Sequence, residues 1–149
     1  MRIFLDANII MEYFGKRKYY DLVSHILKNA YQGNFDVCLS SSIVDNVIYL
    51  LGSQLKAEGI HEPEKRNRIR QMLVRLLSYV DVVDMNRRFI LQALRDEEFK
   101  DLEDGLQYYC ALENKCDALV TINTKDFPSS SSFIEILDPK QFVDKYIED

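Results

Sequence analysis

The sequence predicts an α/β protein with three layers, α/β/α, built around a mostly parallel sheet of about five strands. Two features predict this class. Short apolar segments alternate along the chain with longer segments in which apolar residues recur at helical spacing. Strands that alternate with helices pair in parallel through right-handed crossovers, and helices then cover both faces of the sheet. The 149 residues have the length of one domain, so we expect a single domain over residues 1–149.

The first part of the chain predicts a strand, two helices and a second strand. A strand is expected at residues 2–5, and it ends at Asp6, where a helix over residues 7–14 begins. A second helix is expected at residues 20–31, because its apolar residues fall on one face. A second strand follows at residues 35–39.

The middle of the chain predicts three helices and one strand. The serines at positions 40–42 offer an N-cap for a long helix over residues 43–56. A basic amphipathic helix is expected at residues 62–79. Pro63 does not exclude it, because proline is tolerated in the first turn of a helix. A third strand is expected at residues 80–83 and a further helix at residues 86–95.

The last part of the chain predicts a helix that opens at Asp101 and two more strands. The strands are expected at residues 118–122 and 133–137, on either side of a polar loop with four serines at positions 129–132. A closing helix is expected at residues 139–147.

Acidic side chains are expected to meet at the carboxyl edge of this sheet, where ligands of open α/β proteins bind. Asp6 follows the first strand, Asp101 and Asp104 are neighbours on one helix face, and Asp126 follows the fourth strand. Carboxylates that converge raise each other's pKa unless a cation lies between them. The pattern therefore predicts a site for Mg²⁺ or Mn²⁺.

Three motifs resemble those of PIN-domain ribonucleases, including the toxins of bacterial VapBC-type toxin-antitoxin pairs. They are LDANII around Asp6, DLEDGLQYYCALENKCDALVT around Asp104 and TINTKDF around Asp126. The resemblance covers essentially the whole chain. It implies a pocket of four acids that holds one or two divalent ions and a hydrolase that cuts RNA, with Asp6, Asp104 and Asp126 as three of the acids. It also implies a small antitoxin protein as a partner and leaves homodimer formation open.

The fourth acid of the family is a glutamate, and the register of this sequence places Asn46 there. An asparagine offers a neutral oxygen to a hard cation, so the site loses one negative charge. Asp45 lies about 100° away around the helix and cannot simply take its place. Asp101 is the more plausible additional carboxylate.

Polar residues beside the acids are expected to support them or to contact the substrate. These are Asn8, Thr121 and Asn123.

Each acid also has a purely structural interpretation. Asp6 is a suitable helix N-cap, and Asp101 with Asp104 fits a variant capping box in which acids favour the amino end of a helix. Asp45 is a cap partner in a first turn, and Asp126 is a turn former. Tyrosine pairs at positions 19–20 and 108–109 could stack on bases, although packing against the protein is the simpler interpretation.

Two other functions remain open from the sequence. A PIN-like module that binds RNA or protein without efficient hydrolysis would explain Asn46. A phosphoacceptor domain of the response-regulator type also gathers acids at this edge, but it requires an acidic pair near position 6 and an acceptor after the third strand, where Asp84 fits only loosely.

Composition narrows these alternatives. The net charge of −5 argues against coating of nucleic acid by the whole surface, although basic clusters such as residues 16–18 can still bind phosphate. His25 and His61 have no partners at zinc-ligand spacing, and the three cysteines are expected to be free core thiols. The sequence shows no apolar run of membrane-spanning length and no signal peptide, so we expect a cytoplasmic protein without membrane contact.

Overall fold

The structure is a computed structural model that describes residues 1–128 and 133–147. Five parallel strands form one sheet in the order β3-β2-β1-β4-β5, which confirms the predicted class. The strands are β1 (Arg2–Leu5), β2 (Asp36–Ser40), β3 (Asp81–Val83), β4 (Ala118–Val120) and β5 (Glu135–Leu137). The helices are α1 (Ala7–Phe14), α2 (Tyr20–Tyr31), α3 (Val44–Ala57), α4 (Glu64–Leu77), α5 (Arg87–Arg95), α6 (Leu102–Glu113) and α7 (Pro139–Tyr146), with short 3₁₀ turns η1 (Ser41–Ile43) and η2 (Thr124–Asp126).

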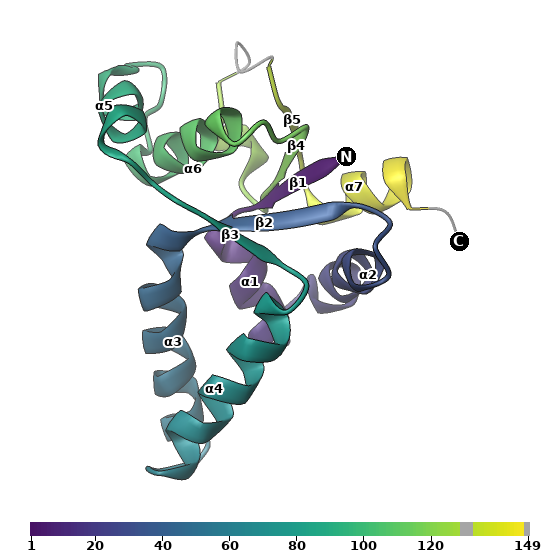
Figure 1. The fold of residues 1–149 in the computed structure, drawn as a ribbon, viewed down its shortest axis with the longest axis vertical. Coiled ribbons are helices and arrows are strands. Elements are labelled where there is room, and N and C mark those ends of the chain that lie inside the picture. The colour runs from purple at the N-terminus through teal and green to yellow at the C-terminus, as the bar shows by residue number, and fades with distance from the viewer. Residues whose placement is uncertain (129–132, 148–149) are drawn as a thin grey trace.

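Helices cover both faces of the sheet (Figure 1). The larger core packs the β1 side chains Ile3 and Leu5 against α1, α2, α3 and α7, while Phe4 points into a second core under α6. The central strand is therefore apolar on both faces, as a parallel sheet covered by two helical layers requires. Among the described residues, no helix is long and apolar enough to cross a membrane.

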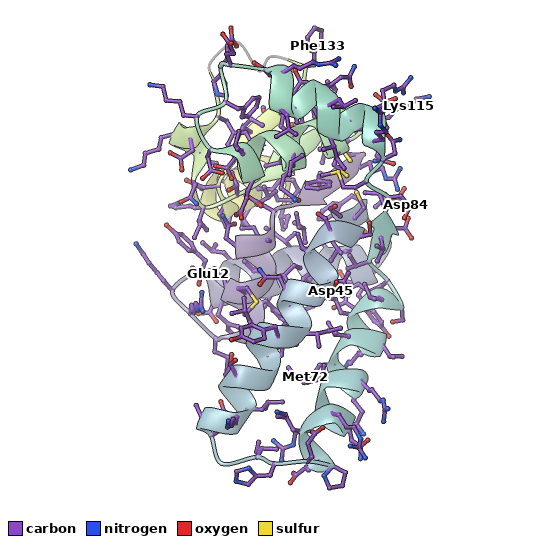
Figure 2. All side chains as sticks on the ribbon, turned by 90° about the vertical axis from the view of Figure 1, so that its left-hand side faces the viewer. Glu12, Asp45, Met72, Asp84, Lys115 and Phe133 are labelled. Carbon is purple, nitrogen blue, oxygen red and sulfur yellow. The ribbon has the colours of Figure 1, made fainter. Side chains whose placement is uncertain are left out.

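Helices α3 and α4 run side by side and project away from the sheet (Figure 1). In α3 only Val47, Leu51 and Leu55 are buried, and in α4 only Leu76 is buried. Few side chains of the pair are buried, and the two helices form an arm whose inner end joins the sheet. Figure 2 labels Asp45 at this inner end, where the arm joins the rest of the molecule.

Several predicted boundaries were wrong at the ends of elements. Strand β2 is shifted by one residue, and the serines cap a 3₁₀ turn through Ser40 instead of α3, whose own N-cap, Ile43, makes no side-chain bond. Helix α4 begins at Glu64, after Pro63, and β5 begins at Glu135. The predicted serine loop at 129–132 lies outside the described residues.

Strand β4 ends at Val120, two residues earlier than predicted. The backbone N–H of Ile122 donates to the side-chain oxygen of Asn8 at 3.4 Å, and that of Asn123 donates to the Thr121 hydroxyl at 3.2 Å. Because side chains take these amides, the strand cannot continue its ladder there.

The three cysteines are free and buried, as predicted. The sulfurs of Cys38 and Cys116 lie 3.5 Å apart beneath α6.

Candidate functional site

Asp6 lies at the carboxyl end of the central strand and caps α1. Its Oδ1 accepts a hydrogen bond from the Ala7 backbone N–H at 2.7 Å. Its Oδ2 accepts from the Thr121 hydroxyl at 2.9 Å and from the Asn8 amide at 3.4 Å. The same Asn8 amide lies 3.2 Å from the Thr121 hydroxyl. Asp6 is 4% exposed and Thr121 is fully buried, so two polar side chains and one backbone N–H fix this carboxylate deep in the edge of the sheet.

Asp104 comes to the same edge from the first turn of α6. Asp101 caps this helix, since its Oδ1 accepts from the Asp104 backbone N–H at 3.0 Å. The next residue, Gly105, allows close packing, because a Cβ there would lie only 3.3 Å from the Phe99 side chain. Asp104 is 7% exposed, and its Oδ2 is buried without a hydrogen-bond partner among the described residues.

The two buried carboxylates are electrostatically strained. Burial, followed by the charges of Asp6, Asp101, Asp126 and Glu103, raises the pKa of Asp104 from 3.8 to about 7. Burial also raises the pKa of Asp6, and its hydrogen bonds to Thr121 and Ala7 oppose that rise only in part. Acids from three segments of the chain thus act on one another, as expected for carboxylates that share an edge.

The remaining predicted acids lie at the surface of the site. Asp126 ends the 3₁₀ turn η2, and both it and Asp101 are exposed. The two line one surface cavity together with the basic side chains of Lys100 and Lys125. Asn123 is exposed beside them. We call these exposed residues the rim, which is mixed in charge, and the buried pair Asp6 and Asp104 the acidic floor. The floor does not line the cavity itself, but the charges of Asp101 and Asp126 act on Asp104.

Asn46 and Asp45 are both exposed in the first turn of α3, and neither side chain forms a hydrogen bond with the described residues. The start of α3 is nevertheless tied to α6, because the Gln107 amide lies 3.5 Å from the Ser42 hydroxyl, which is 2.7 Å from that of Ser40.

The sequence analysis missed Gln107, which is buried one turn after Asp104 on α6. Its Oε1 has no hydrogen-bond partner in the described part of the chain, as is true of Asp104 Oδ2. Residues three apart are neighbours on a helix face, so this spacing was the signal that could have revealed it. Glu103, which contributes to the raised pKa of both buried acids, was missed as well.

The donor set suits a hard divalent cation, although it does not enclose one. Within residues 1–128 and 133–147, no three His, Cys, Asp or Glu side chains lie close enough together to hold a metal ion by themselves. Mg²⁺ usually keeps several waters and binds through one or two carboxylates, so a closed protein cage is not required. The buried, unpaired Oδ2 of Asp104 and the mutual repulsion of the acids are the features that a cation would relieve.

Comparisons with known proteins agree on the fold. A sequence family described as PIN domain matches residues 2–125 of this chain. Ribonuclease VapC1 of Aquifex aeolicus (strain VF5) is 25% identical over 150 residues, which cover 97% of this chain and 95% of the relative. Among solved structures, VapBC2 from Rickettsia felis, bound to a DNA fragment from its promoter, aligns with a TM-score of 0.65 and 19% identity. That alignment covers 93% of this chain and 98% of the other.

Proposed function

The chain belongs to the PIN domain family, and on this premise we propose that it is a divalent-metal-dependent endoribonuclease that hydrolyses RNA phosphodiester bonds. We propose one catalytic domain over residues 1–149. The observation that carries the proposal is the pair of buried carboxylates, Asp6 and Asp104, which come from distant segments and meet at the carboxyl edge with raised pKa values. A purely structural role does not account for an unpaired carboxylate oxygen in a buried position.

In this proposal Asp6, Asp104 and Asp126 hold one or two Mg²⁺ or Mn²⁺ ions, with Asn46 and Asp101 as further oxygen donors. When bound, such ions stabilise the negative charge that develops on the scissile phosphate. Asn8 and Thr121 orient Asp6, because their hydrogen bonds leave its carboxylate a single position. Asp104 offers its free Oδ2, while Asp126 and Asn123 contribute from the exposed rim.

Lys100 and Lys125 supply positive charge beside the acids. RNA brings a phosphate at every nucleotide, and the acidic floor alone would repel it. Neither lysine forms an ion pair with another described residue, so both are free to contact phosphate oxygens on either side of the reacting bond.

We further propose that the enzyme is the toxin of a toxin-antitoxin pair and that a small antitoxin protein silences it. Two similarities support this. The relative named ribonuclease VapC1 aligns over nearly the whole of both chains, and the similar solved structure is a VapBC2 complex. Homodimer formation is compatible with the same scheme.

The test is RNA cleavage by purified protein with Mg²⁺ or Mn²⁺, beside a chelator control. Asp6→Asn and Asp104→Asn proteins, prepared identically, guard against a contaminating nuclease. We expect each substitution to lower the cleavage rate by more than about a hundredfold, since losing even a residue that orients a metal ligand costs about 10- to 100-fold. Full activity of either variant, or cleavage that persists in chelator, would contradict the proposal.

A second function is favoured by Asn46 and by the open arrangement of the acids. A PIN-like module with weakened catalysis would bind RNA or a protein without cutting RNA efficiently. Calorimetry with Mn²⁺ separates the two functions: the enzyme binds the ion through its acids, whereas neither metal binding nor cleavage is expected of the binding module.

A further inference from the structure

A groove rich in tyrosine lies between α1, α2 and α4. It is at the carboxyl end of α1, whereas Asp6 caps the amino end of that helix. Two adjoining cavities share Tyr13, Tyr20, Arg75 and Tyr79 in their walls. We call the cavity that is also lined by Lys16 the inner one, and the cavity that is also lined by Tyr31 the outer one. Figure 1 shows the sheet-proximal end of α4 close to α1, as the shared lining requires. We call this feature the tyrosine groove. None of the acids described above lines it, and Tyr13 lies about 9 Å along the helix from Ala7, at 1.5 Å per residue.

The four tyrosine rings of the tyrosine groove are arranged in two pairs. Tyr13 and Tyr20 stack with centroids 5.6 Å apart and planes at 15°. Tyr31 and Tyr79 meet edge to face at 5.5 Å and 85°. Tyr31 is 73% exposed, so most of its ring is open to solvent. In the described part of the chain no hydrogen bond engages the hydroxyl of Tyr13, Tyr20 or Tyr79. Tyr13, Tyr20 and Tyr79 are partly exposed, and Tyr13 and Tyr79 also pack against the core, so Tyr31 offers the most open ring of the groove. An open and rigidly supported ring of this kind stacks well on a base.

Positive charge accompanies the rings. Lys16 lines the inner cavity, Lys28 the outer one and Arg75 both. None of the three pairs with a carboxylate among the described residues, so their charges are not neutralised by a neighbour as those of Arg68 and Arg88 are. A protein with a net charge of −5 therefore keeps three unpaired cations around one aromatic surface. The buried hydroxyl of Ser24, also unpaired among the described residues, lies in the wall of the outer cavity.

We propose that the tyrosine groove is a second binding site for single-stranded RNA, separate from the acidic edge, in which tyrosines stack on bases and Lys16, Lys28 and Arg75 contact phosphates. The choice of RNA as the occupant rests on the proposed ribonuclease function. Single-stranded RNA matches both features of the groove, because it supplies planar bases and a regular series of negative charges. The surface of a partner protein does not ordinarily alternate planar rings with negative charges in this way.

The test is fluorescence anisotropy with a 5′-labelled single-stranded oligoribonucleotide of about ten nucleotides, a length within the usual range for such sites of roughly 4–16. The protein is the full chain carrying Asp104→Asn, in chelator, so that binding is measured without cleavage. Two matched pairs of additional substitutions separate the groove from the general surface. Tyr31→Leu is compared with Tyr49→Leu, since Tyr49 is 71% exposed on α3 and lies outside the groove. Arg75→Gln is compared with Arg70→Gln on the same helix.

We expect Tyr31→Leu to weaken RNA binding about fivefold or more, the lower range for the loss of one stacked base. Arg75→Gln should reduce the slope of log affinity against log salt by about 0.7, the value for one phosphate contact to a single strand. Tyr49→Leu and Arg70→Gln should leave both quantities unchanged. All four positions are largely exposed, so the folded state should survive, and thermal melting of each variant verifies this.

Equal losses in the groove variants and their controls, or no loss in any, would overturn the proposal. Sedimentation of the same proteins tests the competing occupants. If the groove substitutions change self-association while RNA binding stays intact, the groove is an interface between two copies and the proposal fails. The result is independent of catalysis. RNA binding that depends on the groove supports the inference even if the unsubstituted chain cuts no RNA. Cleavage of RNA without groove-dependent binding refutes this inference and leaves the proposed ribonuclease function standing.

Discussion

The acids of the candidate site fall into two groups that differ in burial. Asp6 and Asp104 are almost completely buried, and their pKa values are raised. Asp101 and Asp126 are exposed at the rim, where solvent screens their charges. The buried pair is held by the fold, since one acid ends the central strand and the other opens α6. The rim acids lie at a helix cap and a 3₁₀ turn, which are easier to rearrange.

This difference indicates what each group contributes. Buried charges that repel one another destabilise the folded state, and carboxylates with raised pKa values cluster at functional sites. Exposed charges cost little and adjust the affinity for a ligand. We therefore expect substitutions in the buried pair to affect stability and cation binding together, and substitutions at the rim to affect cation binding alone.

The largest effect is expected from Asp104→Asn on stability. An acid whose folded pKa is raised loses stability as the pH rises from its unfolded pKa of 3.8 through its folded pKa of about 7, because the folded state then binds more protons than the unfolded state. At pH 8.5 in chelator the variant should be more stable than the parent by about 2 kcal/mol, less than the full shift implies because solvent screening reduces it. At pH 5, which is above the unfolded pKa but below the folded one, the difference should be smaller, below about 1 kcal/mol. Urea unfolding at both pH values measures this.

A stability difference that is the same at pH 5 and pH 8.5 would show that the carboxylate charge is not the cause. Adding Mn²⁺ at pH 8.5 sharpens the comparison, because a bound cation should remove much of the parent's disadvantage and leave the variant nearly unaffected.

A smaller effect is expected from Asp126→Asn at the rim. The free energy of unfolding should stay within about 0.5 kcal/mol of the parent, as for most exposed substitutions. The affinity for Mn²⁺, measured by calorimetry, should fall about tenfold, because one anionic ligand becomes neutral. Asp144→Asn is the matched control, since Asp144 is an exposed acid on α7 that pairs with Lys140. If both variants bind Mn²⁺ as the parent does, Asp126 is not a ligand.

The smallest effect is expected from Asn46→Glu. Adding one exposed negative charge close to a cation contributes about 1 kcal/mol in water, so Mn²⁺ affinity should rise about fivefold. Asp45→Asn, one position away and on another part of the helix surface, should have no effect. A rise with Asn46→Glu supports the register that sets Asn46 among the ligands, whereas unchanged affinity would remove Asn46 from the site.

The sequence predicted elements well where local signals define both ends. Helices α1 and α2 have the predicted bounds, because Asp6 caps the first and apolar periodicity runs the length of the second. The predicted carboxyl end of β4 was wrong, because the strand ends before the backbone N–H of Ile122 donates to the side chain of Asn8. Those residues are 114 positions apart, and no local pattern records the contact.

The candidate site shows the same limit. The positions of Asp6 and Asp104 follow from the ends of two predicted elements, so their approach to one edge could be anticipated from topology. The unpaired oxygen of Gln107 could not, because it depends on how α6 packs beneath the sheet edge. The role of Asn46 also depends on side-chain placement, and it stays a prediction for the Mn²⁺ measurements to decide.

The all-parallel sheet also governs when the site can exist during synthesis. Strand β1 pairs with β4, Ile3 opposite Ala118 and Leu5 opposite Val120, so no hairpin can bring Asp6 to its partner Thr121. The chain between them must be translated before that strand pair forms, and long-range pairing is slow to fold. A nascent chain on the ribosome therefore carries Asp6 from the outset but lacks an organised site until residue 121 has emerged, so we expect incomplete copies to lack the proposed activity.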